Sequence, residues 1–307
     1  MNARTEMLTI EPRAALPSPL HLHHGGQVAR GTVRYCCSES DGPPLVLLGG
    51  VSAHAEWTWW PRMVGSGLTI DPDHNQLVGI EYLDEPTVDP RDQAHAVVAV
   101  LDHLGLDRVR VVGASYGGMV ALALGEVAPE RVERMMVIAA AHRPHALGTA
   151  WRTIQRRILD LAVHAGAEHD GVALARALAM TTFRSPQEFE NRFGQPGIVN
   201  AGDAQFPVDS YLNHNGERYA RRFSAATYRA LITSVDLHQV DPKAVPVPVH
   251  VVGYTNDALV PPSIVKELAE GLPDCRSLHL LDSIHGHDAF LTDPEPLAPL
   301  IRAALLN

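Results

Sequence analysis

Short apolar runs recur along the chain and are separated by amphipathic stretches. The runs are rich in Val, Leu and Ile, which is typical of strands buried on both faces of a sheet. We expect strands at residues 43–50, 75–83, 108–115, 134–141, 248–255 and 276–283. Helical periodicity marks the stretches RDQAHAVVAVLDHLG, GGMVALALGEVAPERV and PSIVKELAEGLP. The alternation of strand, helix and strand predicts an α/β fold, with a mostly parallel sheet and helices on both faces.

Residues 143–238 break this rhythm, because they carry helical patterns and no buried strand. The helical patterns fall at residues 150–166, 172–180 and 226–238. We interpret 143–238 as an inserted helical lid over the sheet. The α/β core domain is then expected to comprise residues 1–142 and 239–307.

Composition narrows the classes of protein that fit. A chain of 307 residues, 46% of them hydrophobic, is long enough to bury one substantial core. A formal net charge of −10 argues against a broad nucleic-acid or anionic-membrane surface. The N-terminal stretch has no apolar signal region and no apolar run is long enough to span a bilayer, so we expect a cytoplasmic protein. Cys36, Cys37 and Cys275 lack the spacing of a zinc site or disulfide framework and are expected to be reduced thiols.

The run VVGASYGGMV, residues 111–120, places a serine between glycines where a strand passes into a helix. In a G-x-S-x-G turn the glycines allow a tight, strained bend and close packing, so the serine hydroxyl is presented at the carboxyl edge of the sheet. We therefore predict that Ser115 is a nucleophile. The backbone N–H of Tyr116, at the start of the helix, is expected to stabilise an oxyanion.

A serine nucleophile needs a base and an orienting acid, which follow in the order acid then histidine in this kind of fold. Asp257 lies just past one predicted strand, and His287 lies just past the next. Both would reach the same sheet edge as Ser115, which predicts a catalytic triad. Asp282 is the alternative acid and His285 the alternative base.

The sequence resembles the homoserine O-acyltransferases of methionine biosynthesis, a family with the α/β-hydrolase fold. The resemblance covers most of the chain. The segments that carry it are WWPRMVGSGLTID (59–71), GASYGGMVAL (113–122), LARALAMTTFRSPQEFENRF (174–193), SYLNHNGERYARRF (210–223) and HGHDAF (285–290).

The resemblance implies a ping-pong acyl transfer from acyl-CoA to L-homoserine, with no permanently bound cofactor. It gives Ser115, Asp257 and His287 as the triad, Arg176 for the substrate carboxylate and Asp288 for its amino group. Recognition of a free amino acid requires both a cation and an anion, whereas a plain esterase requires neither. We take acetyl-CoA as the default donor; succinyl-CoA as donor and serine as acceptor remain alternatives, and we expect a homodimer.

Two departures from the family pattern concern the substrate pocket. Phe183 of TTFRS replaces a tyrosine that the family commonly has, and the glycine-rich segment that usually follows the third strand is missing. The second oxyanion donor is expected to be the amide of Val51 or Ser52, in VLLGGVSAH. The missing glycine-rich segment bears on the shape of the acyl channel, and with it on the identity of the acyl donor.

The remaining polar clusters allow more than one interpretation. The histidines of HLHHGG (21–26) have no carboxylate or cysteine at ligand spacing, so we expect a disordered or edge segment and no metal site. Arg152, Arg156 and Arg157 form a helical basic stripe that would meet the phosphates of coenzyme A or face solvent. A serine hydrolase and a non-catalytic ligand-binding protein on the same scaffold are the alternative functions.

Overall fold

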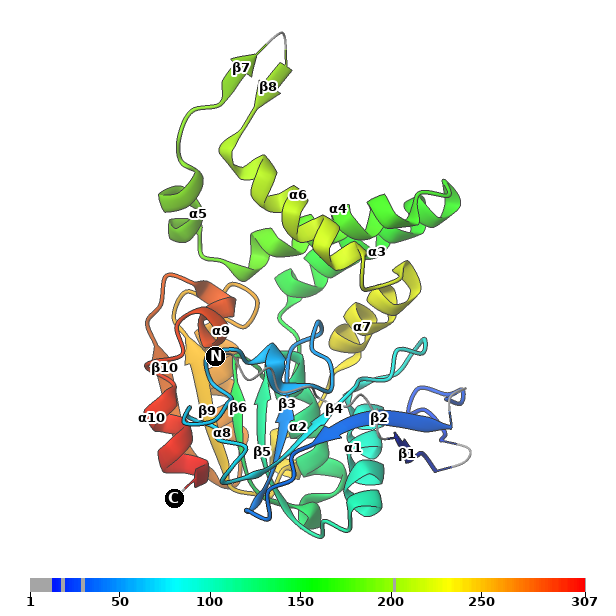
Figure 1. The fold of residues 1–307 in the computed structure, drawn as a ribbon, viewed down its shortest axis with the longest axis vertical. Coiled ribbons are helices and arrows are strands. Elements are labelled where there is room, and N and C mark those ends of the chain that lie inside the picture. The colour runs from blue at the N-terminus through cyan, green and yellow to red at the C-terminus, as the bar shows by residue number, and fades with distance from the viewer. Residues whose placement is uncertain (1–12, 18–19, 29–30, 201–202, 307) are drawn as a thin grey trace, which may run out of the picture.

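A computed structural model describes residues 13–17, 20–28, 31–200 and 203–306. Its centre is an eight-stranded sheet with the strand order β1-β2-β4-β3-β5-β6-β9-β10 (Figure 1). The strands are β1 (Arg13–Ala15), β2 (Thr32–Cys37), β3 (Pro44–Leu48), β4 (Gln76–Ile80), β5 (Val109–Ala114), β6 (Val132–Ile138), β9 (Val249–Tyr254) and β10 (Cys275–Leu281). All pairs from β4 to β10 are parallel, whereas β1 and β2 run antiparallel to their neighbours. The predicted α/β class with a mostly parallel sheet is confirmed.

Both faces of the sheet are buried along its central strands, as the continuous apolar runs predicted, whereas β10, also predicted to be buried, is an edge strand with no buried residue. In β3, Val46 and Leu48 face one hydrophobic cluster, while Leu45 and Leu47 face the other. Three helices outside the segment between β6 and β9 pack in the first cluster. Two short helices and a final π-helical turn cover the second. The first set is α1 (Pro90–Leu104), α2 (Tyr116–Val127) and α8 (Pro262–Gly271); the second is α9 (Ala289–Thr292), α10 (Ala298–Ile301) and Arg302–Leu306.

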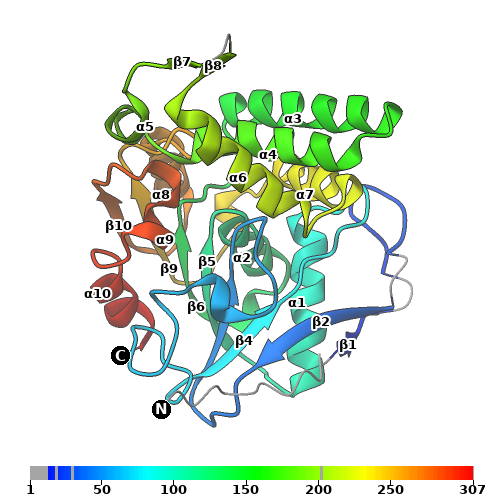
Figure 2. The same ribbon diagram turned by 45° about the horizontal axis from the view of Figure 1, so that its top comes forward.

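Between β6 and β9 the chain forms five helices and a small hairpin, which we call the lid insertion (residues 143–238). The helices are α3 (Ala146–His164), α4 (Glu168–Phe183), α5 (Pro186–Phe193), α6 (Pro207–Ala220) and α7 (Ala225–Leu237). Figure 2 shows α3, α4, α6 and α7 lying together over one end of the sheet. They share a small core of their own, which includes Leu159, Val172, Tyr219 and Tyr228.

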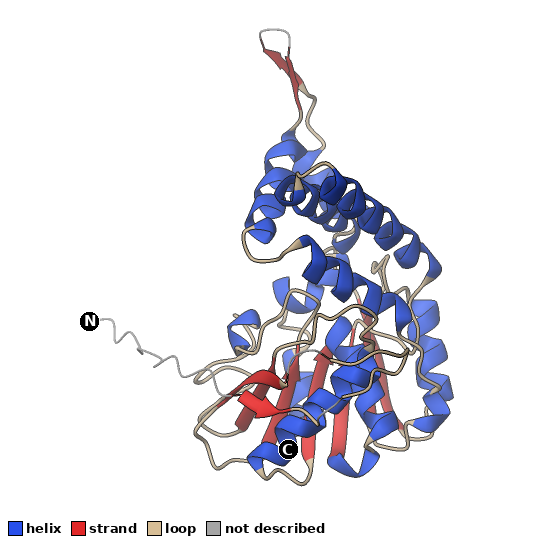
Figure 3. Cartoon of the chain, turned by 90° about the vertical axis from the view of Figure 1, so that its right-hand side faces the viewer, coloured by secondary structure: helices blue, strands red, loops and turns tan. Residues whose placement is uncertain are grey.

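The hairpin of the lid insertion consists of β7 (Ile198–Asn200) and β8 (Asp203–Gln205). It projects from the helices away from the sheet (Figure 3). Ile198 and Val199 are 63% and 73% exposed, so these short strands differ from the buried strands that the sequence pattern was used to find. None of the helices in the described part of the chain combines the length and the apolar character needed to cross a membrane.

Candidate active site

Ser115 occupies a sharp turn between β5 and α2. Its φ of 54° is positive, a conformation that costs a non-glycine residue about 1–3 kcal/mol and is kept where the surroundings enforce it. A Cβ on Gly113 would lie 2.3 Å from the Gly117 carbonyl oxygen, and a Cβ on Gly117 would lie 2.1 Å from the Leu48 carbonyl oxygen. The glycines of the motif are therefore needed because β3, β5 and α2 pack backbone against backbone beneath the serine.

The structure brings Ser115, His287 and Asp257 together in one hydrogen-bonded chain. Ser115 Oγ lies 2.7 Å from His287 Nε2, and His287 Nδ1 lies 2.7 Å from Asp257 Oδ2. The backbone N–H groups of Leu259 and Val260 donate to the other Asp257 oxygen at 2.8 and 2.9 Å. With Nδ1–H donating to the carboxylate, Nε2 is free to accept the serine proton. This is the geometry of an activated serine nucleophile.

Electrostatics raise the pKa of His287. Burial of the imidazole would by itself lower the pKa, but the charge and hydrogen bond of Asp257 and the charge of Asp288 outweigh it. The net shift is upward, which favours the protonated imidazole that forms when the serine attacks. Asp257 and His287 are only 3% and 4% exposed, so water screens this interaction little.

The alternative acid and base are both engaged elsewhere. Asp282 is exposed and accepts hydrogen bonds from Thr255 Oγ1 at 2.7 Å and Asn256 Nδ2 at 3.2 Å. His285 Nδ1 lies 3.0 Å from a Glu188 oxygen on α5. Neither side chain contacts the serine hydroxyl in this arrangement.

Two backbone amides flank the position that an oxyanion would take. Tyr116 is the first residue of α2, so its N–H has no partner within the helix. Val51, in the turn after β3, lines the same cavity as Ser115, and its amide donates no hydrogen bond within the described part of the chain. The Ser52 hydroxyl accepts a hydrogen bond from the Trp59 indole at 3.4 Å. The positions of Tyr116 and Val51 fit an oxyanion hole.

A cavity lies between the sheet edge and the lid insertion, with Ser115 and His287 at its base. Its volume is about 660 Å³, which includes the part that is open to solvent at its mouth. Core residues contribute one wall, and α3, α4 and α7 of the lid insertion contribute the other. The lining side chains include Met119, Trp151, Arg152, Gln155, Arg176, Thr182, Phe183, Tyr228, Leu259 and Val260.

Arg176 is the cation on the α4 wall of this cavity. Its guanidinium carbon lies 4.9 Å from the centroid of the Phe183 ring and 4.6 Å from that of Tyr219. No ion pair between Arg176 and a carboxylate occurs among the described residues. Aromatic faces stabilise the cation without neutralising its charge, so Arg176 suits an incoming anion. Phe183, which replaces the family tyrosine, also lies against the His287 ring at 6.1 Å between centroids.

Asp288, the expected partner of the substrate amino group, pairs with an arginine of the lid insertion. It follows His287 directly, but its side chain does not line the cavity; an oxygen lies 3.3 Å from Arg184 Nε. Burial raises the pKa of Asp288, and the charges of Arg184 and His287 oppose that shift. Arg184 also pairs with Glu188 at 3.3 Å. These contacts join the lid insertion to the loop that carries His287.

The basic stripe on α3 divides between two environments. Arg152 lines the cavity and pairs with Asp236 of α7 at 2.7 Å, and Arg156 pairs with the other oxygen of Asp236 at 2.6 Å. Arg157 is exposed. The sequence identified the stripe but did not indicate that Arg152 lies close to the nucleophile. The spacing of the three arginines shows that they share one face of the helix. Where that face lies relative to the cavity depends on tertiary packing.

Gln155 and Tyr228 are cavity residues that sequence reasoning missed. The Tyr228 hydroxyl donates to Gln155 Oε1 at 2.9 Å, and both side chains are buried. A buried glutamine on an amphipathic helix is a signal that could have been used, because it must find partners. Among the described residues, the group of side chains that could hold a metal ion lies outside this cavity.

Comparisons with known proteins agree with this geometry. Residues 87–294 match the model of a family described as the alpha/beta hydrolase fold. The homoserine O-succinyltransferase of Xanthomonas campestris pv. campestris is 36% identical over 95% of this chain and 84% of the relative. The homoserine O-acetyltransferase of Deinococcus radiodurans is 37% identical over 85% of this chain and 81% of the relative.

Solved structures are similar in fold at much lower identity. A homoserine O-acetyltransferase from Bacillus anthracis superposes with a TM-score of 0.86 at 16% identity, covering 97% of each chain. Esterase E22 superposes with a TM-score of 0.84 at 19% identity, covering 95% of this chain and 98% of the esterase. At these identities the likeness concerns the fold alone, since transferases and esterases share it.

Proposed function

Because the chain belongs to the homoserine O-acyltransferase family of the α/β-hydrolase fold, we propose that it transfers an acyl group from coenzyme A to the hydroxyl of L-homoserine. This reaction would serve methionine biosynthesis. The observation that carries the proposal is that Ser115, His287 and Arg176 line one cavity, and that Arg176 pairs with no carboxylate among the described residues. A nucleophile accounts for acyl transfer, and the cation accounts for an amino-acid acceptor.

In the first half-reaction His287 Nε2 takes the hydroxyl proton as Ser115 Oγ attacks the thioester carbonyl. The tetrahedral oxyanion is stabilised by the N–H groups of Tyr116 and Val51. The carbon–sulfur bond then breaks, His287 gives its proton to the thiolate, and coenzyme A leaves. The product is an acyl ester on Ser115, while Asp257 stabilises the imidazolium in between.

In the second half-reaction homoserine takes the place of coenzyme A. Its carboxylate pairs with Arg176, and His287 removes its hydroxyl proton as that oxygen attacks the acyl-serine. The Ser115 oxygen leaves with the proton that His287 returns, and O-acylhomoserine departs. Asp288 remains our candidate for the substrate ammonium; its carboxylate, which pairs with Arg184 and does not line the cavity in this arrangement, would have to turn toward the substrate. The lid insertion would disfavour water as the second nucleophile.

For the donor, the arginines on α3 support succinyl-CoA over the acetyl-CoA default. Arg152 and Arg156 share the single carboxylate of Asp236, so one positive charge is left over at the cavity wall. An acetyl group has no use for that charge. A succinyl group ends in a carboxylate, and a guanidinium with only 12% of its side chain exposed binds an anion more strongly than one in open water.

The donor proposal is tested by replacing Arg152 with leucine and, as the matched control, exposed Arg157 on the same helix with leucine. We expect Arg152→Leu to lower kcat/KM for succinyl-CoA by about 10- to 100-fold, from the loss of a charge-assisted hydrogen bond, and to leave acetyl-CoA less affected. Arg157→Leu should leave both unchanged. An equal loss for both donors would make Arg152 a residue that positions the lid insertion.

The lid insertion also supports the expected homodimer. Leu147, Ile154 and Leu161 recur every seven residues along α3 and are 47%, 48% and 72% exposed. Such side chains form an apolar stripe on one face of the helix, and burial of this stripe against a partner surface is favourable. Analytical ultracentrifugation of the wild type and Leu161→Lys tests this assignment, because the charge would shift the population toward monomer. Use of acyl-CoA and homoserine supports a cytoplasmic location.

The rival function is a serine hydrolase, for which the triad alone would suffice. It is distinguished by the acceptor: release of coenzyme A from acyl-CoA should accelerate strongly with homoserine and weakly with water alone. A ligand-binding protein without catalysis would release none. A fluorophosphonate probe should label Ser115 in either enzyme and should fail with Ser115→Ala.

A further inference from the structure

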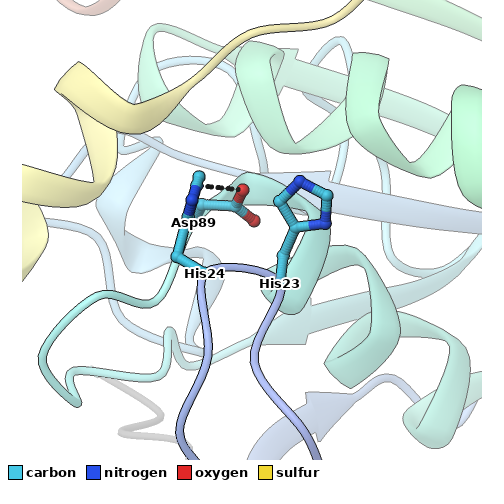
Figure 4. A group of neighbouring side chains, drawn as sticks. All are labelled: His23, His24 and Asp89. Atoms are coloured by element: carbon cyan, nitrogen blue, oxygen red, sulfur yellow. Dashed lines mark ion pairs between the residues drawn. The ribbon is translucent and has the colours of Figure 1, made fainter.

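A second cluster of ionisable side chains lies outside the active-site cavity, at the start of α1. His23 and His24 come from a loop that the His21–Gln27 bridge closes, and Asp89 is the N-cap of α1. One ligand atom of each of the three lies within 4.8 Å of the others. Figure 4 shows the two imidazoles on either side of the carboxylate. The sequence places no carboxylate at ligand spacing from these histidines, but the fold supplies one from a distant element.

The two oxygens of Asp89, whose side chain is fully buried, have different surroundings. Oδ1 caps α1 by accepting hydrogen bonds from the backbone N–H groups of Arg91 and Asp92 at 2.8 and 3.1 Å. Oδ2 accepts no hydrogen bond within the described part of the chain, and His24 Nε2 lies 3.0 Å away outside hydrogen-bonding geometry. A buried carboxylate oxygen of this kind favours a cation beside it.

Among the described side chains close to Asp89, carboxylates outnumber guanidinium groups. Asp92 is also buried, and its Oδ2 accepts the Asp89 N–H at 2.8 Å. Arg91 lies 3.9 Å from Asp89 but makes its closer contact with Glu126, at 2.6 Å. Among the described residues Arg91 is thus shared between Asp89 and Glu126, Asp92 adds a third carboxylate, and an additional positive charge would be stabilised there.

We propose that His23, His24 and Asp89 bind a divalent transition-metal ion of the zinc class. Two imidazoles and one carboxylate are a common ligand set for zinc, and the exposure of both histidines leaves the fourth position to solvent. Ligand atoms about 2.0–2.2 Å from a tetrahedral zinc ion lie roughly 3.3–3.6 Å from one another. In the structure the ligand atoms lie within 4.8 Å of one another, and rotation of the two exposed imidazole rings would bring them to this shorter spacing.

The backbone of the loop is already in place for such a site. The His23 N–H donates to Asp92 Oδ1 at 2.9 Å, and the His21–Gln27 bridge closes the loop on the other side. Binding therefore requires only side-chain rotation, which lowers its entropic cost. The bound ion would fix this loop against the first turn of α1.

The test uses tag-free full-length protein stripped of metal with a chelator. Titration with Co²⁺, followed by its visible absorption bands, and with Zn²⁺, followed by calorimetry, should show one equivalent bound. Asp89→Asn retains an N-cap and removes the charge, and His24→Gln leaves Asp89 intact. Each should weaken binding at least tenfold, because even partners of metal ligands contribute that much. His74→Gln and His21→Gln are matched controls that should bind as the wild type does.

A thermal readout and an activity readout separate this site from the catalytic one. Zn²⁺ should raise the Tm of the wild type but not of His24→Gln, and should leave coenzyme A release unchanged at one equivalent. Absence of cobalt absorption, or equal binding by the wild type and both variants, would overturn the proposal. Binding that survives His24→Gln and blocks coenzyme A release would place the metal at His287 instead and would also overturn it.

Discussion

Removal of the Arg176 charge should separate the two half-reactions. In the proposed mechanism this guanidinium contacts the homoserine carboxylate and makes no contact with the acyl thioester. Two replacements are informative: Arg176→Met keeps an unbranched apolar stem against the rings of Phe183 and Tyr219, and Arg176→Ala removes the stem as well. The first isolates the charge, and the second adds the packing.

The magnitude follows from the contact that is lost. A hydrogen bond to a charged group is worth about 1.5–3 kcal/mol, which corresponds to roughly 10- to 150-fold in kcat/KM for homoserine. The two cation–π contacts of Arg176, at 4.9 and 4.6 Å, add about 0.5–1 kcal/mol each to the stability of the lid insertion. Arg192 is the matched control, since it also lies over two rings, Phe193 and Tyr211, but outside the cavity.

The assay measures the steps separately. Rapid mixing with acyl-CoA alone should release one equivalent of coenzyme A in a burst, at the same rate in the wild type, Arg176→Met and Arg192→Met. Steady-state turnover with homoserine should fall only in Arg176→Met. A burst slowed as much as turnover would mean that Arg176 positions the lid insertion or the coenzyme. Unchanged turnover would remove the residue-level reason to prefer a transferase over an esterase.

Three further predictions concern the triad and the turn beneath it. Asp257→Asn should lower kcat by about 10⁴-fold in the coenzyme A release assay while circular dichroism stays unchanged, because the imidazole loses its orienting partner; near-normal activity would contradict the assigned acid. His287 must be neutral to act as the base, and its pKa is raised. The midpoint of the acidic limb of kcat/KM against pH should therefore lie above the ordinary histidine pKa of about 6.5. A limb below that value would refute the shift. Gly113→Ala should lower stability in urea unfolding by about 1–3 kcal/mol, since the new Cβ would lie 2.3 Å from a backbone oxygen, whereas Gly31→Ala meets nothing within 4 Å; equal stabilities would refute the packing argument.

Features set by neighbouring residues were predictable from the sequence. The six predicted strands follow from apolar runs, although the edge strand β10 is not buried, and the Ser115 turn follows from glycines two residues away on each side. The edge strand β1 and its neighbour β2 were missed because their burial alternates, and β1 has only three residues. Short half-exposed strands give little periodic signal.

Features that depend on distant parts of the chain were not predictable in the same way. The family resemblance assigned Asp288 to the substrate amino group, but nothing in the sequence indicated that Arg184 of the lid insertion would pair with its carboxylate. Asp89 meets His24 only after α1 has packed beside the N-terminal loop. Spacing along the chain indicates which side chains share an element, whereas the partner across a tertiary contact is known only once the fold is formed.

Release of free coenzyme A from succinyl-CoA and acetyl-CoA, each with homoserine, serine or water, tests the central claim most directly. Ser115→Ala provides the background for every combination. We predict that homoserine gives the fastest release, that succinyl-CoA exceeds acetyl-CoA, and that O-acylhomoserine forms in amounts equal to the coenzyme A released. Release that proceeds equally fast with water alone, with free acid as the product, would contradict acyl transfer and identify the protein as a hydrolase.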